Sequence, residues 1–137
     1  MPSRRMLRER ALQALYAIEV GGREPTEVLD EVFGNGGASE ERAFVRELVL
    51  GTIAGADAAD ERIGPALQGW TLDRLAIVDR TILRLAVCES ERSEAPPRAV
   101  IINEAVELAK RYSTPEAARF VNGVLSGILG DATSAEA

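Results

Sequence analysis

Residues 114–129 read TPEAARFVNGVLSGIL, and this stretch offers a choice between a hairpin and a helix. The dipeptide Asn122-Gly123 is a strong hairpin signal, because both residues tolerate the positive φ angles of a tight turn. The flanking apolar residues instead recur with the spacing of one helical face, at Val121, Val124, Leu125 and Ile128. Thr114 is a preferred N-cap and Pro115 suits the first helical position, so the stretch predicts a helix.

Working outward, the same helical spacing of apolar residues recurs along most of the chain. Ser3 and Ser39 are expected N-caps, and Pro residues at 96 and 97 are expected to end the most apolar segment. That segment should form the central helix of a bundle, since it is apolar nearly all round. The expected helices cover residues 4–20, 25–33, 39–63, 72–92, 100–112 and 115–129.

Composition also favours a helical domain and excludes several classes of function. The 137 residues are 46% hydrophobic but only 4% aromatic, and they include no histidine and one cysteine, Cys88. Most metal sites, a histidine-based catalytic triad and an intramolecular disulfide are thereby excluded. We therefore expect no cofactor and no catalytic site. No run approaches the roughly 18 apolar residues of a membrane span, so we expect a cytoplasmic protein.

Charge is distributed unevenly along the chain. The net charge is −6, but residues 1–23 carry five basic and two acidic residues, whereas the remainder carries 11 basic and 20 acidic residues. Of the 16 basic residues only Lys110 is a lysine. Arginine favours bidentate contact with phosphate, although a GC-rich genome would give the same bias.

The face of the first helix opposite its expected core combines arginine with an aromatic ring. A 100° projection places four residues on this face, with Arg8 beside them: Arg5, Glu9, Leu12 and Tyr16. Guanidinium on phosphate and a ring on a base is how many proteins hold single-stranded nucleic acid. The alternative is that Leu12 and Tyr16 pack against a neighbouring helix while the arginines are solvated.

The last helix has a comparable stripe beside its core face. Phe120, Gly123 and Gly127 share this stripe with Glu116. The two glycines would leave a groove for another backbone, with Phe120 at its edge as a stacking platform. The alternative is close helix packing through small residues. Elsewhere, Asp73, Asp79 and Glu89 with their neighbouring arginines are interpreted as helix-surface ion pairs.

Three strings together resemble the NusB family of bacterial transcription antitermination factors. They are RRMLRERALQALY, VDRTILRLAV and INEAVELAKRYSTPEAARFVNGVL, and the resemblance extends from Arg4 to about Leu129. It implies an all-α bundle of about seven helices in two packed subdomains, over about residues 1–68 and 69–130. The small, polar residues of 131–137, DATSAEA, predict a flexible tail. Cys88, Ser90, Met6 and Leu7 depart from the family pattern.

The resemblance also implies a non-enzymatic function. NusB proteins pair with NusE, a small-subunit ribosomal protein, and the pair binds boxA-type single-stranded RNA of ribosomal RNA transcripts. This helps RNA polymerase, within an antitermination complex, to pass terminators. The segments that match the family, together with the ring on the first helix, give as RNA-binding candidates Arg4, Arg5, Arg8, Tyr16, Phe120, Asn122 and Gly123. The resemblance also implies that the partner binds on the central helix, where the candidates are Asp79, Arg80 and Arg84.

Two other functions fit the same residues. A stand-alone NusB-like RNA-binding module could serve ribosomal RNA modification through a separate protein. A homodimeric helical protein could instead bury its arginine and Phe120 surfaces against a second copy and bind no RNA.

Overall fold

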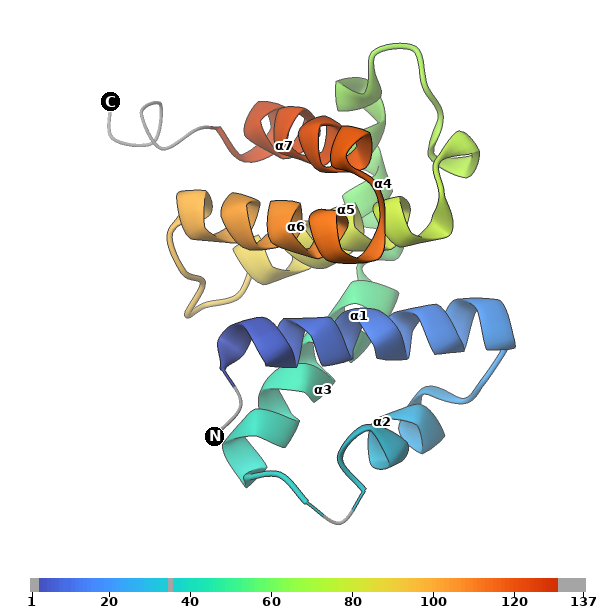
Figure 1. Cartoon of the computed structure of the whole chain (residues 1–137), viewed down its shortest axis with the longest axis vertical. Helices are drawn as coiled ribbons and strands as arrows, with labels where there is room; N and C mark the ends of the chain where they lie inside the picture. The colour runs from blue at the N-terminus through green and yellow to red at the C-terminus, as the bar shows by residue number, and fades with distance from the viewer. Residues whose placement is uncertain (1–2, 35, 131–137) are drawn as a thin grey trace. The chain divides into compact units, whose positions relative to one another are not determined.

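The computed structural model describes residues 3–34 and 36–130, and these residues fold into helices (Figure 1). Seven α-helices and two short 3-10 helices are present, and no strand occurs among the described residues. The predicted all-α fold is therefore confirmed. The tail at residues 131–137, for which we expected flexibility, lies outside the described residues.

The helices form two compact units that divide between Ala54 and Gly55. The sequence suggested a division at about residue 68 and a single long helix over 39–63. Gly55 instead separates two helices, α3 (Ser39–Ala54) and α4 (Ala56–Ile63), with backbone angles of φ −96° and ψ 9° that leave the helical region. Because α4 packs against α5 (Ile77–Ser90), it belongs to the second unit.

The first unit contains α1 (Arg4–Gly21), α2 (Pro25–Phe33) and α3, and α1 contacts both of the others. Ser3 is the N-cap of α1, as predicted, because its hydroxyl accepts a hydrogen bond from the Met6 backbone N–H at 3.2 Å. Gly22 ends the helix in the left-handed conformation, with φ +63°. The buried apolar side chains of α1 are Leu7, Ala11, Leu12, Ala14 and Leu15.

The start of α3 differs by one residue from the expectation that Ser39 is its N-cap. Ser39 is already helical, and the Ala38 carbonyl accepts the first helical hydrogen bond, from Arg42 N–H at 3.0 Å. The Glu41 carboxylate accepts a hydrogen bond from Ala38 N–H at 3.0 Å. This contact is the reciprocal half of a capping box, so the acidic residue stabilises the start of the helix without the serine hydroxyl.

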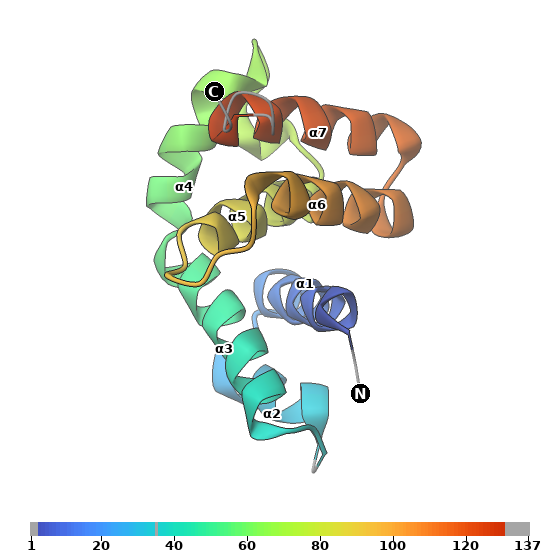
Figure 2. The ribbon, with the colours of Figure 1, turned by 90° about the vertical axis from the view of Figure 1, so that its left-hand side faces the viewer.

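The second unit is built around α5. Helices α4, α6 (Arg98–Tyr112) and α7 (Pro115–Leu129) all pack against α5, and α7 also contacts the 3-10 helix η1 (Gly64–Leu67). Figures 1 and 2 show α6 and α7 side by side and antiparallel. The central position of α5 is confirmed by its buried residues, which are Thr81, Ile82, Leu83, Leu85, Ala86, Val87 and Glu89.

Helix α7 contains the turn-prone dipeptide without interruption. The Thr114 hydroxyl accepts a hydrogen bond from Ala117 N–H at 3.0 Å, and Pro115 is the first helical residue, as predicted. Three of the four apolar residues on the predicted face are buried, and Ile128 is half-buried. Capping and burial of this face therefore outweigh the local preference of Asn122-Gly123 for a turn.

Candidate nucleic-acid interface

The first turn of α1 places positive charge at the helix end where it is least favourable. Arg4 and Arg5 begin the helix and are exposed, and no acidic residue lies in this turn. The partial positive charge of a helix N-terminus makes each such cation unfavourable by about 0.3–1 kcal/mol at an exposed site. A compensating contact, or a function, is needed to explain two arginines here.

Phe44 of α3 supplies such a contact within the same unit. The guanidinium carbon of Arg4 lies 3.9 Å from the centre of the Phe44 ring, and that of Arg8 lies 5.9 Å from it. Cation–π contacts of this kind contribute about 0.5–1 kcal/mol when exposed and more when desolvated. The structure thus brings two of the candidate arginines together on one buried ring, that of Phe44.

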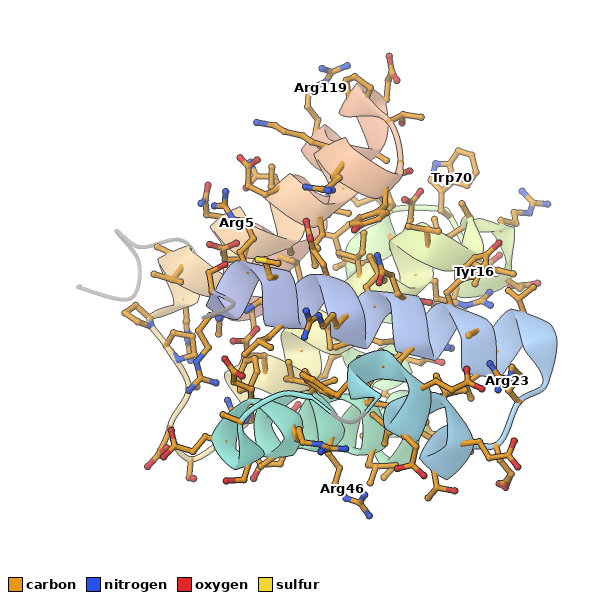
Figure 3. All side chains as sticks on the ribbon, turned by 60° about the horizontal axis from the view of Figure 1, so that its bottom comes forward. Arg5, Tyr16, Arg23, Arg46, Trp70 and Arg119 are labelled. Atoms are coloured by element: carbon orange, nitrogen blue, oxygen red, sulfur yellow. The ribbon has the colours of Figure 1, made fainter. Side chains whose placement is uncertain are left out.

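The candidates on α1 differ in accessibility. Arg8 is only 6% exposed and Leu12 only 3%, whereas Tyr16 is 44% exposed. The helical projection is therefore wrong for Arg8 and Leu12, and the burial of Leu12 agrees with the alternative that this side chain packs inside the protein. Arg4, Arg5 and Tyr16 remain at the surface, where Figure 3 shows Arg5 and Tyr16 on the same helix.

A second cluster of arginine and phenylalanine was missed by the sequence reading. The guanidinium carbons of Arg10 and Arg42 lie 5.1 Å and 5.9 Å from the centre of the Phe33 ring. Gly37 closes over the same ring with φ +87°, and a Cβ there would come within 2.5 Å of Phe33 Cδ1. No spacing rule links these four residues in sequence, because α1, α2 and α3 meet here only in the folded unit.

One of the five N-terminal basic residues is neutralised locally. Arg23 donates two hydrogen bonds to the Glu31 carboxylate, at 2.7 Å and 2.5 Å. These hydrogen bonds lower the pKa of Glu31, and the pair is exposed to solvent. Arg23 is therefore engaged with an acidic side chain of α2 and lies apart from the arginines at the start of α1.

The candidates on α7 occupy one turn of its exposed side. Phe120 is half-buried, while Asn122 and Gly123 are exposed. A Cβ added at Gly123 or Gly127 would meet no atom within 4 Å beyond its chain neighbours and the nearby backbone of its own helix. The glycines are therefore not needed for helix packing within the described residues, which argues against the small-residue packing alternative. Glu116 lies on the same side and approaches Arg119 at 3.8 Å, with both side chains exposed.

The partner-binding candidates on α5 are all half-buried, and one already has a structural role. Arg84 donates to both carboxylate oxygens of Asp60 in α4, each at 2.7 Å, with side-chain exposures of 20% and 26%. Arg80 donates to the Leu72 carbonyl at 3.4 Å. Asp79 lies in the first turn of α5, where a carboxylate is favoured by the helix dipole. Arg84 thus joins α4 to α5, a pairing that the sequence reading did not foresee.

The described residues contain neither a candidate metal site nor a candidate membrane span. No cluster of three or more His, Cys, Asp or Glu side chains there could hold a metal ion. No helix in this part of the chain is long and apolar enough to cross a membrane.

Comparison with known proteins identifies the family. The sequence model of the NusB family matches residues 5–129. The chain belongs to the NusB family. It is 44% identical over 126 residues to the transcription antitermination protein NusB of Bacillus cereus (strain B4264), an alignment that covers 91% of this chain and 95% of that protein.

Solved NusB structures share the fold over most of their length. NusB from T. maritima is similar with a TM-score of 0.85 and 33% identity, covering 93% of this chain and 90% of the other. A crystal structure of the antitermination factors NusB and NusE in complex with dsRNA gives a TM-score of 0.78 at 30% identity, covering 91% and 94%. The family resemblance and the predicted fold are therefore confirmed.

Proposed function

We propose that this NusB-family protein is a transcription antitermination factor that binds RNA together with NusE. The observation that carries the proposal is the similarity, over nine-tenths of the chain, to NusB in a complex with NusE and dsRNA. The relative in B. cereus is likewise named for antitermination. The protein would act in the cytoplasm by bringing RNA and partner together, without a catalytic step.

Within this function, two sets of side chains would contact RNA. On α1 these are Arg4, which contacts the Phe44 ring, and Arg5, with Tyr16 further along the helix. On α7 they are Phe120, Asn122 and Gly123, where the open surface beside the glycine allows a backbone to approach closely. Arg8 contributes indirectly, because its guanidinium is buried beside the ring that also holds Arg4.

Binding to RNA without NusE should be weak. Only two of the candidate arginines are exposed, and the chain as a whole carries a net charge of −6. Each phosphate neutralised on a single strand changes the logarithmic salt slope by about 0.7, so two contacts give a slope of about −1.4. NusE would supply the remaining contacts, and Asp79 and Arg80 at the start of α5 are the residues proposed to meet it.

A fluorescence anisotropy titration tests the proposal. Labelled boxA-type single-stranded RNA, a scrambled RNA and a duplex of the same sequence are titrated with the full chain at two salt concentrations, with and without NusE. We expect selective binding to boxA-type RNA that tightens with NusE and weakens in Arg5→Ala and Phe120→Ala variants. Equal weak binding to every RNA, unaffected by NusE, would overturn the proposal.

Sedimentation of the protein alone, over a range of concentrations, addresses the homodimer alternative. A monomer that binds RNA as above supports the proposed function. A stable dimer that dissociates only in the Arg5→Ala or Phe120→Ala variants would show that a second copy covers these surfaces.

A further inference from the structure

Trp70 is the only tryptophan of the chain and lies on the loop between η1 and the 3-10 helix η2 (Leu72–Arg74). Its side chain is 56% exposed, more than any other large apolar side chain among the described residues. Figure 3 shows the indole projecting away from the ribbon. Exposed tryptophan is uncommon on a protein surface and is enriched at the centres of binding interfaces.

The backbone that carries Trp70 adopts a conformation that is unfavourable for its sequence. Gln68 has φ +51° and ψ +58°, and it is the only non-glycine residue with positive φ in the described part of the chain. Gly69 follows with φ +97°, and Trp70 N–H donates to the Leu67 carbonyl at 3.3 Å. Two successive positive φ angles form a tight turn that normally requires glycine or asparagine. Local strain of this kind is concentrated at functional sites.

The turn is held firmly on both sides. Leu67, immediately before it, is only 1% exposed. After it, Arg74 N–H donates to the Thr71 carbonyl at 3.0 Å, and Arg80 of α5 donates to the Leu72 carbonyl at 3.4 Å. The indole is therefore presented from a fixed backbone, which reduces the entropy lost when a partner covers it.

The charges around the loop favour a protein partner over RNA. A hydrogen bond from Thr71 lowers the pKa of Asp73, so this carboxylate is ionised at neutral pH, and its neighbour Arg74 balances it. Residues 64–75 contain no other charged side chain, and the Arg80 guanidinium, which donates to the Leu72 carbonyl, adds a second positive charge beside the loop. Platforms that stack RNA bases lie in positively charged grooves, whereas a ring with a polar rim of both charges is typical of protein interfaces.

We infer that Trp70 is an anchor residue for NusE, and that the partner surface extends from Asp79 and Arg80 onto the loop at residues 67–75. The inference rests on the proposed function. Arg80 joins the start of α5 to the loop, because its side chain donates to the Leu72 carbonyl.

Trp70 itself supplies the probe that tests this inference. Incorporation of 5-fluorotryptophan into this chain alone gives a single 19F resonance, which is followed while unlabelled NusE or boxA-type RNA is added. We expect the resonance to shift with NusE and to stay unchanged with RNA alone. By calorimetry, Trp70→Ala should weaken NusE binding by about thirtyfold, as truncation of a hot-spot residue typically does. Trp70→Phe should recover part of the loss.

Val100→Ala is the matched control, because Val100 is also exposed and apolar in the same unit. It should leave NusE binding unchanged, and circular dichroism should show that all three variants remain folded. A resonance that shifts with RNA alone would make the loop a base-stacking platform and overturn the inference. So would a shift with protein concentration, which would indicate a second copy of the chain.

Failure of the inference and failure of the proposed function give different results. If calorimetry shows NusE binding but the resonance stays fixed and Trp70→Ala binds normally, Trp70 lies outside the interface and only the inference is overturned. If the unaltered chain does not bind NusE at all, the proposed function and the inference both fail.

Discussion

Replacing Gly123 by alanine should separate the stability of α7 from its function. Glycine inside a helix is less favourable than alanine by about 1 kcal/mol, because it loses more backbone freedom on folding. The new Cβ would meet nothing within 4 Å, so no clash offsets this gain. For a chain of this size, 1 kcal/mol corresponds to a rise in melting temperature of about 3–5 °C.

RNA binding should change in the opposite direction. If an RNA backbone approaches Gly123 beside Phe120, a methyl group there introduces a steric misfit of about 1–2 kcal/mol, or roughly tenfold in affinity. Thermal unfolding followed by circular dichroism measures the first effect. Anisotropy of boxA-type RNA with NusE present measures the second.

Gly127→Ala serves as the control, because Gly127 lies one turn further along α7 and has the same open surroundings. It should give the same gain in stability with a smaller loss of RNA affinity. A lower melting temperature for Gly123→Ala would refute the view that this surface is open. Unchanged RNA affinity would place Gly123 outside the interface.

Three further substitutions test other contacts. Glu116→Gln should strengthen RNA binding measured by anisotropy, because it removes a carboxylate from the proposed surface; weaker binding would show that the surface is misplaced. Arg84→Ala should lower the free energy of unfolding in urea by about 2 kcal/mol, since it leaves a half-buried carboxylate unpaired, whereas Arg62→Ala, which breaks an exposed pair, should cost less than about 1 kcal/mol. Gly37→Ala should destabilise the folded protein by more than about 1 kcal/mol, because Gly37 has positive φ and a Cβ there would contact the Phe33 ring. Gly36→Ala, at a residue with negative φ, should not; equal melting temperatures for the two variants would contradict this.

Features encoded over a few residues were predictable from the sequence. Thr114 and Pro115 indicated the start of α7, and Ser3 the start of α1, because capping depends on the first three residues of a helix. The all-round apolar pattern indicated the central position of α5. Such local signals were sufficient for the fold class and for most helices.

Contacts between residues far apart in sequence were not predictable. Arg84 and Asp60 are 24 residues apart, and only the packing of α5 on α4 brings them together. The cation–π contacts of Arg4 and Arg8 with Phe44 similarly depend on how α1 meets α3. Helical projection also misplaced Leu12, because it assumes one buried face, whereas α1 buries residues around more of its circumference.

The contact between Arg4 and Phe44 makes arginine and lysine unequal at this position. The guanidinium carbon of Arg4 lies 3.9 Å from the ring centre, a distance at which a planar guanidinium can stack by its face while its N–H donors point outward in its own plane. One side chain can therefore stack on protein and still offer a two-pronged hydrogen bond to a phosphate. A lysine ammonium has no such separation between face and edge. A lysine at position 4 would keep the positive charge but could not make both contacts in this way.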